Sequence, residues 1–172
     1  MTHFPILKQA VVASILLLVG YSPLQAADLE TPRGEVVLTV SGQVASTNVA
    51  ETARFDMDML HAMPRQSFTT TTIWTEGAQQ FEGVPLKALL DAVGANGETL
   101  HMVALNDYAV DIPLEALADH APIIAYRVNG KDISVRDKGP LWIVYPYDSD
   151  PRYRSELIYS RSIWQLDRIE VR

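Results

Sequence analysis

Residues 81–90, FEGVPLKALL, decide the fold predicted for this chain. Apolar residues follow Pro85 at the spacing that lines one face of a helix, and they are Leu86, Leu89, Leu90 and Val93. Proline suits the first turn of a helix because its fixed φ angle is helical, and glycine is favoured just past the last turn. The sequence therefore predicts a short helix that begins at Pro85 and ends at Gly94.

Strands are predicted on the N-terminal side of this helix. In residues 36–44 apolar and polar side chains alternate, which is the pattern of a half-buried strand. Residues 66–74 are rich in threonine and end in Trp74, and β-branched residues at this density favour a second strand. Between the two strands, residues 55–63 predict a turn or short helix that stops at Pro64.

The rest of the chain predicts short strands separated by turns. Asn129-Gly130 is its strongest hairpin signal, since both residue types accept the positive φ angles of a two-residue turn. Pro113 opens a second short helix. Further strands are predicted at residues 99–106, 123–128, 141–145 and 169–171. About seven strands with two or three short helices indicate an α+β domain with a mixed or antiparallel sheet.

The composition fits one globular domain and excludes several classes of function. The chain has 172 residues, of which 48% are hydrophobic and 20% charged, so it can bury a core. A net charge of −7 argues against non-specific nucleic-acid binding, which depends on basic side chains. Cysteine is absent and the histidines show no ligand spacing. We therefore expect no disulfide, no cysteine nucleophile and no metal ligated by the protein.

Residues 1–26 have the pattern of a secretory signal peptide. Lys8 gives a positive start, residues 10–19 form an apolar run too short to span a bilayer, and Ala26 offers a small residue for cleavage. A buried N-terminal helix and an uncleaved anchor are the alternatives. We expect cleavage, a single domain at residues 27–172 and a periplasmic location.

Four motifs occur in a fixed order along the chain. They are FEGVPLKALL at 81–90, LNDY at 105–108 with IPL at 112–114, KGPLWIVYP at 138–146 and RSIWQLDRIEV at 161–171. In this order they resemble the molybdopterin-binding domain of the sulfite oxidase family, over about residues 36–172. The resemblance implies an α+β fold with a mixed β-sheet or barrel core and short helices, and a pterin cofactor related to molybdopterin.

One position departs from the pattern of that family. The family has a cysteine that ligates molybdenum shortly before its F-x-G-V phrase, and Trp74 is the closest counterpart here. An indole cannot replace a thiolate, so the family's oxotransferase chemistry does not carry over. The chain is similar to a related group of small, exported, cysteine-free proteins that bind a pterin and report to membrane sensors of cyclic-di-GMP metabolism. That similarity implies a ligand sensor whose partner is the periplasmic domain of a membrane signalling protein.

Side chains suited to binding a pterin lie near these motifs. A pterin is a flat heteroaromatic ring that stacks on an aromatic face and offers paired donors to a carboxylate, and arginine suits an anionic tail. The candidate cofactor-binding residues are Trp74, Glu76, Asp107, Tyr108, Asp148, Arg152, Arg154 and Arg161. The alternatives are core packing for the aromatic residues, a turn for Asp107-Tyr108, and a solvated loop with internal ion pairs for the arginines.

Three functions are compared on these grounds. The first is a non-catalytic periplasmic pterin-binding sensor. The second is a molybdopterin-dependent oxidoreductase that lacks the usual cysteine ligand, and the third is a structural module without a ligand. The absence of cysteine argues against the ordinary form of the second. Metal analysis separates the first two functions, and pterin binding separates the first from the third.

Overall fold

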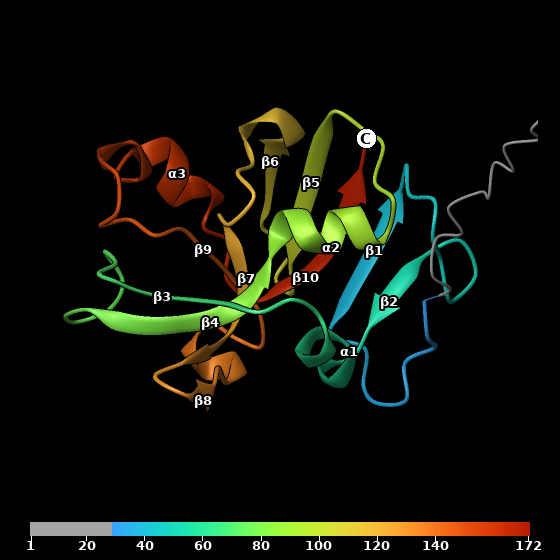
Figure 1. Cartoon of the computed structure of the whole chain (residues 1–172), viewed down its shortest axis with the longest axis horizontal. Helices are drawn as coiled ribbons and strands as arrows, with labels where there is room; N and C mark the ends of the chain where they lie inside the picture. The colour runs from blue at the N-terminus through green and yellow to red at the C-terminus, as the bar shows by residue number, and fades with distance from the viewer. Residues whose placement is uncertain (1–28) are drawn as a thin grey trace, which may run out of the picture.

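The structure is a computed structural model that describes residues 29–172, so the predicted signal peptide at 1–26 lies outside the described residues. The described residues form two β-sheets and three short α-helices (Figure 1). The predicted α+β class is confirmed, and the core is made of two separate sheets. Over the same range, no helix is both long enough and apolar enough to cross a membrane.

The first sheet has five strands of mixed direction. In spatial order they are β2 (Ala53–Phe55), β1 (Leu38–Gly42), β10 (Leu166–Val171), β5 (Thr99–Ala104) and β6 (Ala109–Pro113). β1 and β10 run parallel, and the other neighbours are antiparallel. Segments that are far apart in the sequence therefore meet at the centre of this sheet.

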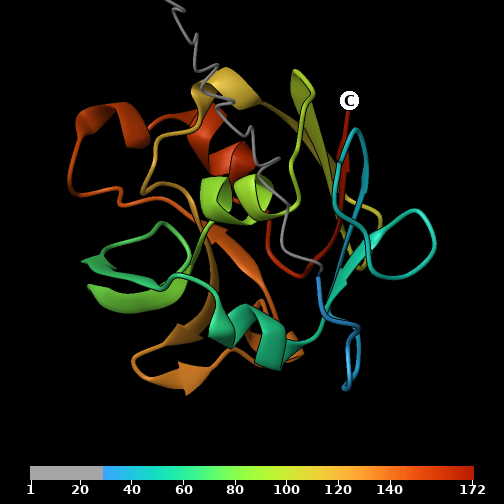
Figure 2. The same cartoon turned by 45° about the vertical axis from the view of Figure 1, so that its right-hand side comes forward.

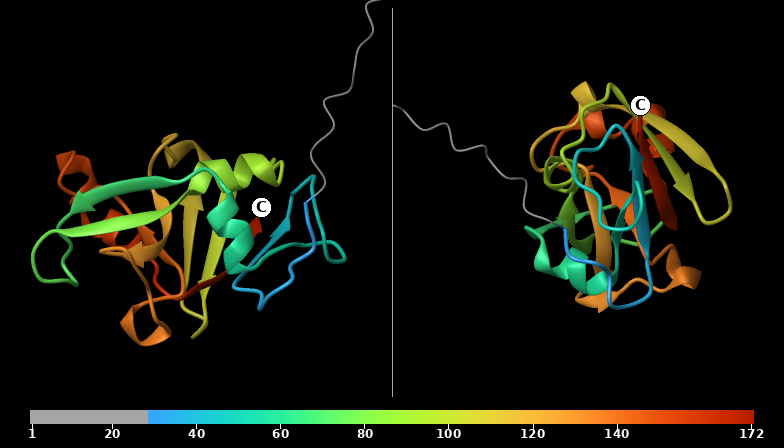
Figure 3. Two further views of the ribbon diagram at one scale, coloured as in Figure 1. Left: turned by 60° about the horizontal axis from the view of Figure 1, so that its bottom comes forward. Right: turned by 90° about the vertical axis from the view of Figure 1, so that its right-hand side faces the viewer.

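The second sheet is antiparallel. Its strands are β3 (Gln66–Thr70), β4 (Gln79–Pro85), β7 (Ile123–Val128) and β8 (Lys131–Asp132), and β9 (Trp142–Val144) also pairs with β7. Asn129 and Gly130 have φ angles of 52° and 76°, so the predicted hairpin turn joins β7 to β8. The β3–β4 pair extends away from the rest of the molecule (Figure 3).

Short helices connect the strands. The α-helices are α1 (Met57–Ala62), α2 (Leu86–Ala92) and α3 (Glu156–Arg161), and single 3-10 turns occur at Leu114–Ala116, Val135–Asp137 and Pro151–Tyr153. α2 is the helix predicted from FEGVPLKALL, and it follows β4 directly. Its three leucines are buried, and it lies over the region where the two sheets meet (Figures 1 and 2). Gly94, with a φ of 62°, follows its end.

The predicted strand at 66–74 is shorter in the structure. β3 ends at Thr70, and a loop follows up to β4. Thr71 donates its backbone N–H and its hydroxyl to the carboxylate of Asp148, so its hydrogen bonds go to another loop instead of a strand. This local partner outweighs the preference of threonine for strands.

Three strands and one α-helix of the structure have no counterpart in the sequence predictions: β2, β4, β6 and α3. β4 contains Gly83, whose lack of a side chain weakens the strand pattern. A Cβ there would collide with the carbonyl oxygen of Ile124 in β7, so the close approach of the two strands requires glycine. The helix predicted from Pro113 is only a single 3-10 turn, because Pro113 itself ends β6.

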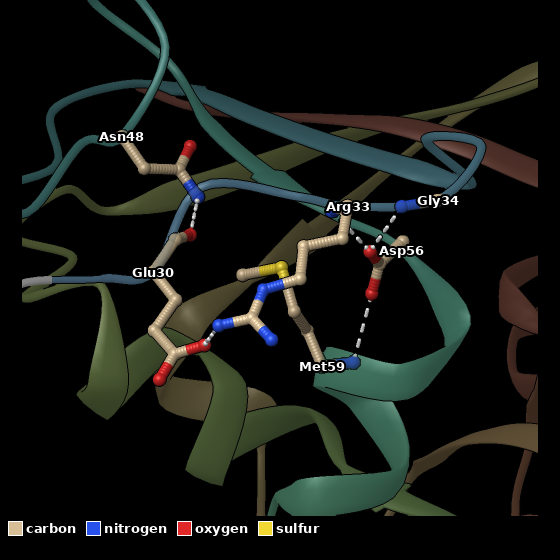
Figure 4. Close-up of polar contacts among 6 residues, drawn as sticks. All are labelled: Glu30, Arg33, Gly34, Asn48, Asp56 and Met59. Carbon is tan, nitrogen blue, oxygen red and sulfur yellow. Dashed lines mark hydrogen bonds and ion pairs between the residues drawn. The ribbon is translucent and has the colours of Figure 1, made fainter.

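One carboxylate joins the segment that leads into β1 to the first helix (Figure 4). Asp56 caps α1 by accepting the backbone N–H of Met59 at 2.9 Å, and it also accepts those of Arg33 and Gly34 at 2.8 Å each. These hydrogen bonds, led by that of Met59, hold the pKa of Asp56 below its usual value. Asp56 is only 3% exposed, so it is part of the folded core.

Candidate functional site

A pocket of about 300 Å³ opens between three segments of the chain. These segments are the loop after β3, the turn between β5 and β6, and the end of α3 with the residues that follow. The lining residues are Trp74, Ala104, Asn106, Tyr108, Tyr159, Ser160, Ser162, Ile163 and Trp164. The lining includes two tryptophans and two tyrosines, and a flat ring can stack on such aromatic surface.

Trp74 is the centre of this aromatic lining. Its ring meets four other aromatic rings edge-on, at centroid distances between 5.7 and 6.2 Å, and these belong to Trp142, Tyr147, Tyr159 and Trp164. Trp142 and Tyr147 are buried in the core, whereas Trp164 is 37% exposed. Trp74 therefore connects the core of the protein with the mouth of the pocket.

The loop that carries Trp74 is held by Asp148. The carboxylate accepts the backbone N–H of Thr71 at 2.6 Å and its hydroxyl at 2.8 Å, and the backbone N–H of Asp148 donates to the hydroxyl of Thr70 at 3.1 Å. The bonds from Thr71 are the main reason that the pKa of Asp148 lies below its usual value, and the charge of Arg154 lowers it further. Asp148 thus supports the loop from outside the pocket lining.

The turn between β5 and β6 forms the opposite wall. Tyr108 is 50% exposed, and its hydroxyl donates to the carbonyl of Ser160 at 3.3 Å. The side-chain oxygen of Asn106 accepts the backbone N–H of Tyr108 at 3.2 Å. Asp107 has a φ of 62° and accepts a hydrogen bond from Arg168 at 2.7 Å, so its carboxylate is engaged away from the lining. The backbone N–H of Leu105 also donates to the carbonyl of Gln165 at 2.9 Å, so this wall is fixed to the segment that leads into β10.

Ser162 is the buried polar residue of the lining, and its hydroxyl has fixed partners. It accepts the hydroxyl of Tyr147 at 2.7 Å and donates to the carbonyl of Ile158 at 2.7 Å. Its own carbonyl accepts the indole N–H of Trp142 at 3.2 Å. Burial raises the pKa of Tyr147 to about 12, so this phenol stays protonated and remains a donor near neutral pH. Ser162 is thus a structural part of the pocket, and among residues 29–172 its hydroxyl bonds to Tyr147 and Ile158 and to no base of the kind that activates a nucleophile.

The three candidate arginines lie outside the lining. Arg152 pairs with Asp150 at 3.3 Å, and Arg154 is exposed without an ion pair among residues 29–172. Arg161 ends α3, and its Nε atom is buried without a hydrogen-bond partner among the described residues. Burial raises the pKa of Tyr145, and the charge of Arg161 opposes part of that rise. Arg161 therefore has one buried donor without a partner among the described residues, and its charge acts on Tyr145.

Of the eight candidate residues, the structure brings Trp74 and Tyr108 into the pocket lining. Glu76 lies two residues after Trp74, and its exposed carboxylate has no hydrogen bond or ion pair in the part of the chain that the structure describes. Sequence reasoning missed Tyr159 and Ser160, because it predicted no helix at α3. The available signal was Ser155, whose side chain caps α3 ahead of an acidic first turn.

The family model of the oxidoreductase molybdopterin binding domain matches residues 29–149. Because this match covers more than half of the chain, the protein belongs to that family. A search of curated proteins found no match. The loop of Trp74 and the β5–β6 turn lie within the matched residues, and the wall that α3 contributes lies beyond them.

The residues present fit one part of the cofactor that this family binds. The aromatic lining suits the pterin ring, which is flat and heteroaromatic. The molybdenum ligand is different, because the chain has no cysteine and therefore no thiolate. Among residues 29–172, no three His, Asp or Glu side chains come together as a metal site. The site therefore offers a binding surface for a pterin without a protein ligand of the family's usual kind for the metal.

Proposed function

We propose that this protein is a non-catalytic pterin-binding protein of the periplasm, which senses its ligand for a membrane signalling partner in cyclic-di-GMP metabolism. Membership of a molybdopterin-binding family supports the pterin as ligand. The observation that carries the proposal is the position of Trp74. It lines an aromatic pocket at the place that the sequence resemblance gives to the metal-binding cysteine, and the chain has no cysteine to take that role.

Each wall of the pocket has a separate part in binding. Trp74 and Tyr159 supply apolar ring surface on which the pterin stacks and from which it excludes water. Asn106 adds an amide that can bond to the ring edge. Glu76 has a free carboxylate near Trp74, and a carboxylate suits the paired donors of a pterin's pyrimidine ring. Arg161 follows the lining residues of α3 in the chain, and its guanidinium is the candidate partner for an anionic tail.

A molybdopterin-dependent oxidoreductase is the second candidate function, and the family match favours it. Bound molybdopterin would supply redox chemistry through a metal held by the sulfur atoms of the cofactor itself. Elemental analysis of the purified protein distinguishes the two functions. About one molybdenum per chain, together with turnover of an oxyanion or a sulfoxide, would replace the sensor by the enzyme.

Export is part of the proposal and has its own test. The pattern of residues 1–26 supports cleavage and a periplasmic location. Intact-mass measurement of protein from the periplasm should give an N-terminus within a residue or two of Ala27. A mature protein that retains Met1 would contradict cleavage.

The central experiment measures pterin binding by calorimetry, after mass spectrometry has identified any ligand released from the purified protein. Removing a central stacking aromatic side chain costs roughly 2 kcal/mol or more, so Trp74→Ala should weaken binding about thirtyfold. Trp74→Phe should recover part of the affinity because it keeps an aromatic face.

Val36→Ala is the matched control, since Val36 is an exposed apolar residue outside the pocket lining. It should bind like the parent protein, and circular dichroism should show that all variants fold. If Trp74→Ala folds and binds pterin as tightly as the parent, the assignment of this pocket is wrong.

A further inference from the structure

One edge of β3 is not covered by another strand of the described chain. β3 is the outermost strand of the second sheet and pairs there only with β4. An open strand edge presents backbone N–H and C=O groups to other chains, and natural sheets protect such edges with lysine, proline or a bulge. The sequence of β3, QSFTT, has no charged residue and no proline, and its register with β4 is unbroken. β3 therefore lacks the usual protection against edge-to-edge pairing.

The hydrogen bonds of β4 show which backbone groups of β3 point to the open edge. The N–H of Asn129 donates to the carbonyl of Gln80 at 2.8 Å, and the N–H of Gln80 donates to the side-chain oxygen of Asn129 at 3.0 Å. Both backbone groups of Gln80 therefore point toward β7 and away from β3. In an antiparallel ladder, such a residue lies opposite one whose groups also point away. Thr69 lies opposite Gln80, so the groups of Thr69, and of Ser67 two residues before it, point to the open edge.

Two features limit the length of the open edge. At one end, the backbone N–H of Thr71 continues the outward series, but the carboxylate of Asp148 already accepts it at 2.6 Å. At the other end, Pro64 has no N–H to offer. Between these ends, the outward backbone groups within residues 65–69 have no hydrogen-bond partner in the part of the chain that the structure describes. The outward residues of β3 are also exposed, so another chain can approach this edge.

We propose that the open edge pairs with the same edge of a second copy of the chain, antiparallel and centred on Ser67. Arg65, Ser67 and Thr69 supply the outward groups, and they are spaced evenly about Ser67. A twofold axis at that residue places Ser67 opposite its own copy and Arg65 opposite Thr69, so each pair can exchange both N–H···O bonds. The second sheets of the two copies then form one continuous sheet. This inference goes beyond the proposed function and does not depend on a pterin.

Charge complementarity favours a second copy as the occupant of this edge. The side chain of Arg65 is 62% exposed and lies 3.8 Å from Glu82. In the antiparallel pairing, Arg65 lies next to Thr71 of the second copy, which is the residue that Asp148 binds. Each copy therefore brings a cation to the end of the edge where the other copy has an exposed anion. An extended segment of another protein would have to supply that cation itself.

The expected dimer is weak and depends on concentration. The paired segments are short, and the outward residues of β3 are a serine and a threonine, so the contact buries backbone and small polar groups more than apolar surface. Small interfaces of this kind are typical of transient association. No residue of β3 lines the pocket, so pairing and pterin binding can be measured separately.

Disulfide trapping tests the pairing and its register. The chain has no cysteine, so a single introduced thiol reports without background. In Ser67→Cys the two thiols belong to directly opposite residues, whose Cα atoms lie about 5.5 Å apart in a hydrogen-bonded antiparallel pair, within the range of a disulfide. Thr69→Cys is the matched control, since Thr69 is also exposed in β3 but would lie about 14 Å along the strand from its own copy.

Mild oxidation of the purified protein should link Ser67→Cys into a dimer about tenfold faster than Thr69→Cys. Equal rates for the two variants would show random collision instead of this register. The absence of a linked dimer from Ser67→Cys would also overturn the proposal.

Sedimentation equilibrium measures pairing in the protein without a crosslink, and it should show a monomer that forms a dimer as the concentration rises. Ser67→Pro removes an outward N–H and leaves the groups that bond to β4, so it should fold by circular dichroism and stay monomeric. Ser67→Ala is its control and should dimerise like the parent. A parent that stays monomeric at every concentration would overturn the proposal, as would a folded Ser67→Pro that dimerises equally well.

A second variant tests the charges without changing the backbone. Arg65→Glu places an anion beside Asp148 of the second copy, so the dimer should dissociate at about fivefold higher concentration. Lys131→Glu is the matched control, because it makes the same change of charge at an exposed residue of β8. Equal dimerisation of the two variants would contradict pairing at this edge. Dimerisation without any pterin binding would retain the edge and refute the sensor, so the two failures are distinguishable.

Discussion

Asp56 and Asp148 perform the same chemical task at two places in the molecule, in different surroundings. Each carboxylate accepts backbone N–H groups from a segment far away in the sequence, and each has a pKa below its usual value. Asp56 is buried and accepts three backbone N–H groups, whereas Asp148 is exposed and accepts one N–H and one hydroxyl. Asp56 joins parts of the fold, and Asp148 holds the loop that carries Trp74.

The difference shows that burial decides what such a carboxylate controls. When a buried acceptor is lost, its donors have no water to replace it, and the folded state bears the full cost. When an exposed acceptor is lost, water replaces it, and the loop loses order while the fold persists. Removing the carboxylate of Asp56 should therefore lower the stability of the fold. Removing that of Asp148 should instead disorder the loop that lines the pocket.

Asp56→Ala should cause the largest loss of stability. The variant leaves the N–H groups of Arg33, Gly34 and Met59 without their acceptor, and α1 without its cap. The midpoint of thermal unfolding, followed by circular dichroism, should fall by several degrees. Asp58→Ala is the matched control, because Asp58 lies in the first turn of the same helix and is exposed. Equal midpoints for the two variants would contradict the structural role of Asp56.

Asp148→Ala should affect pterin binding more than stability. The loop of Trp74 would then have to be ordered during binding, and we expect an affinity about tenfold weaker by calorimetry. Asp150→Ala serves as control, since Asp150 lies in the same loop and pairs with Arg152 instead of Thr71. If Asp148→Ala lowers the unfolding midpoint as much as Asp56→Ala, burial does not separate the two carboxylates.

Acid should reduce the contribution that both carboxylates make to the stability of the folded protein. Their folded-state pKa values lie below the usual 3.8, so each stabilises the protein above that pH and loses its contribution as the pH falls through the folded pKa. The unfolding midpoint should therefore be steady near neutral pH and fall below about pH 4. Asp56→Asn cannot be protonated in the same way, so its midpoint should fall less steeply than that of the parent. Parallel curves for the two proteins would contradict this assignment.

Thr71→Val should have the smallest effect of the four changes. It removes the hydroxyl bond to Asp148 and keeps the stronger backbone N–H bond, so pterin affinity should fall only about twofold. Thr69→Val is the control, because Thr69 lies in β3 and is exposed. An effect of Thr71→Val as large as that of Asp148→Ala would show that the hydroxyl, and not the backbone, holds the loop.

The sequence predicted those parts of the fold that depend on local chemistry. The helix after Pro85 and the Asn129-Gly130 hairpin follow from proline, glycine and apolar spacing, and both are present in the structure. β6 and α3 were missed because neither has a regular local pattern, although β6 pairs with β5, the strand directly before it. β6 pairs with β5 over residues of mixed polarity, and α3 has consecutive apolar residues in place of helical spacing.

The candidate site, like the fold, could be predicted from the sequence only in part. Trp74 and Tyr108 were candidates because they are aromatic residues near the ends of the sequence motifs, and both line the pocket. The engagement of Asp148 with Thr71 could not be read from the sequence, because the two residues are 77 positions apart. A carboxylate in a sequence motif offers no sign of whether its oxygen atoms face a ligand or a backbone N–H group.

The central position of β10 has a consequence for the order in which this protein folds. β10 lies between β1 and β5, so the first sheet has no centre until residues 166–171 are available to pair. Contacts of such long sequence separation form late and slowly. The first sheet of a growing chain therefore stays incomplete until its last residues are made. Under the proposed export, this delay favours passage through a narrow translocation channel before that sheet closes.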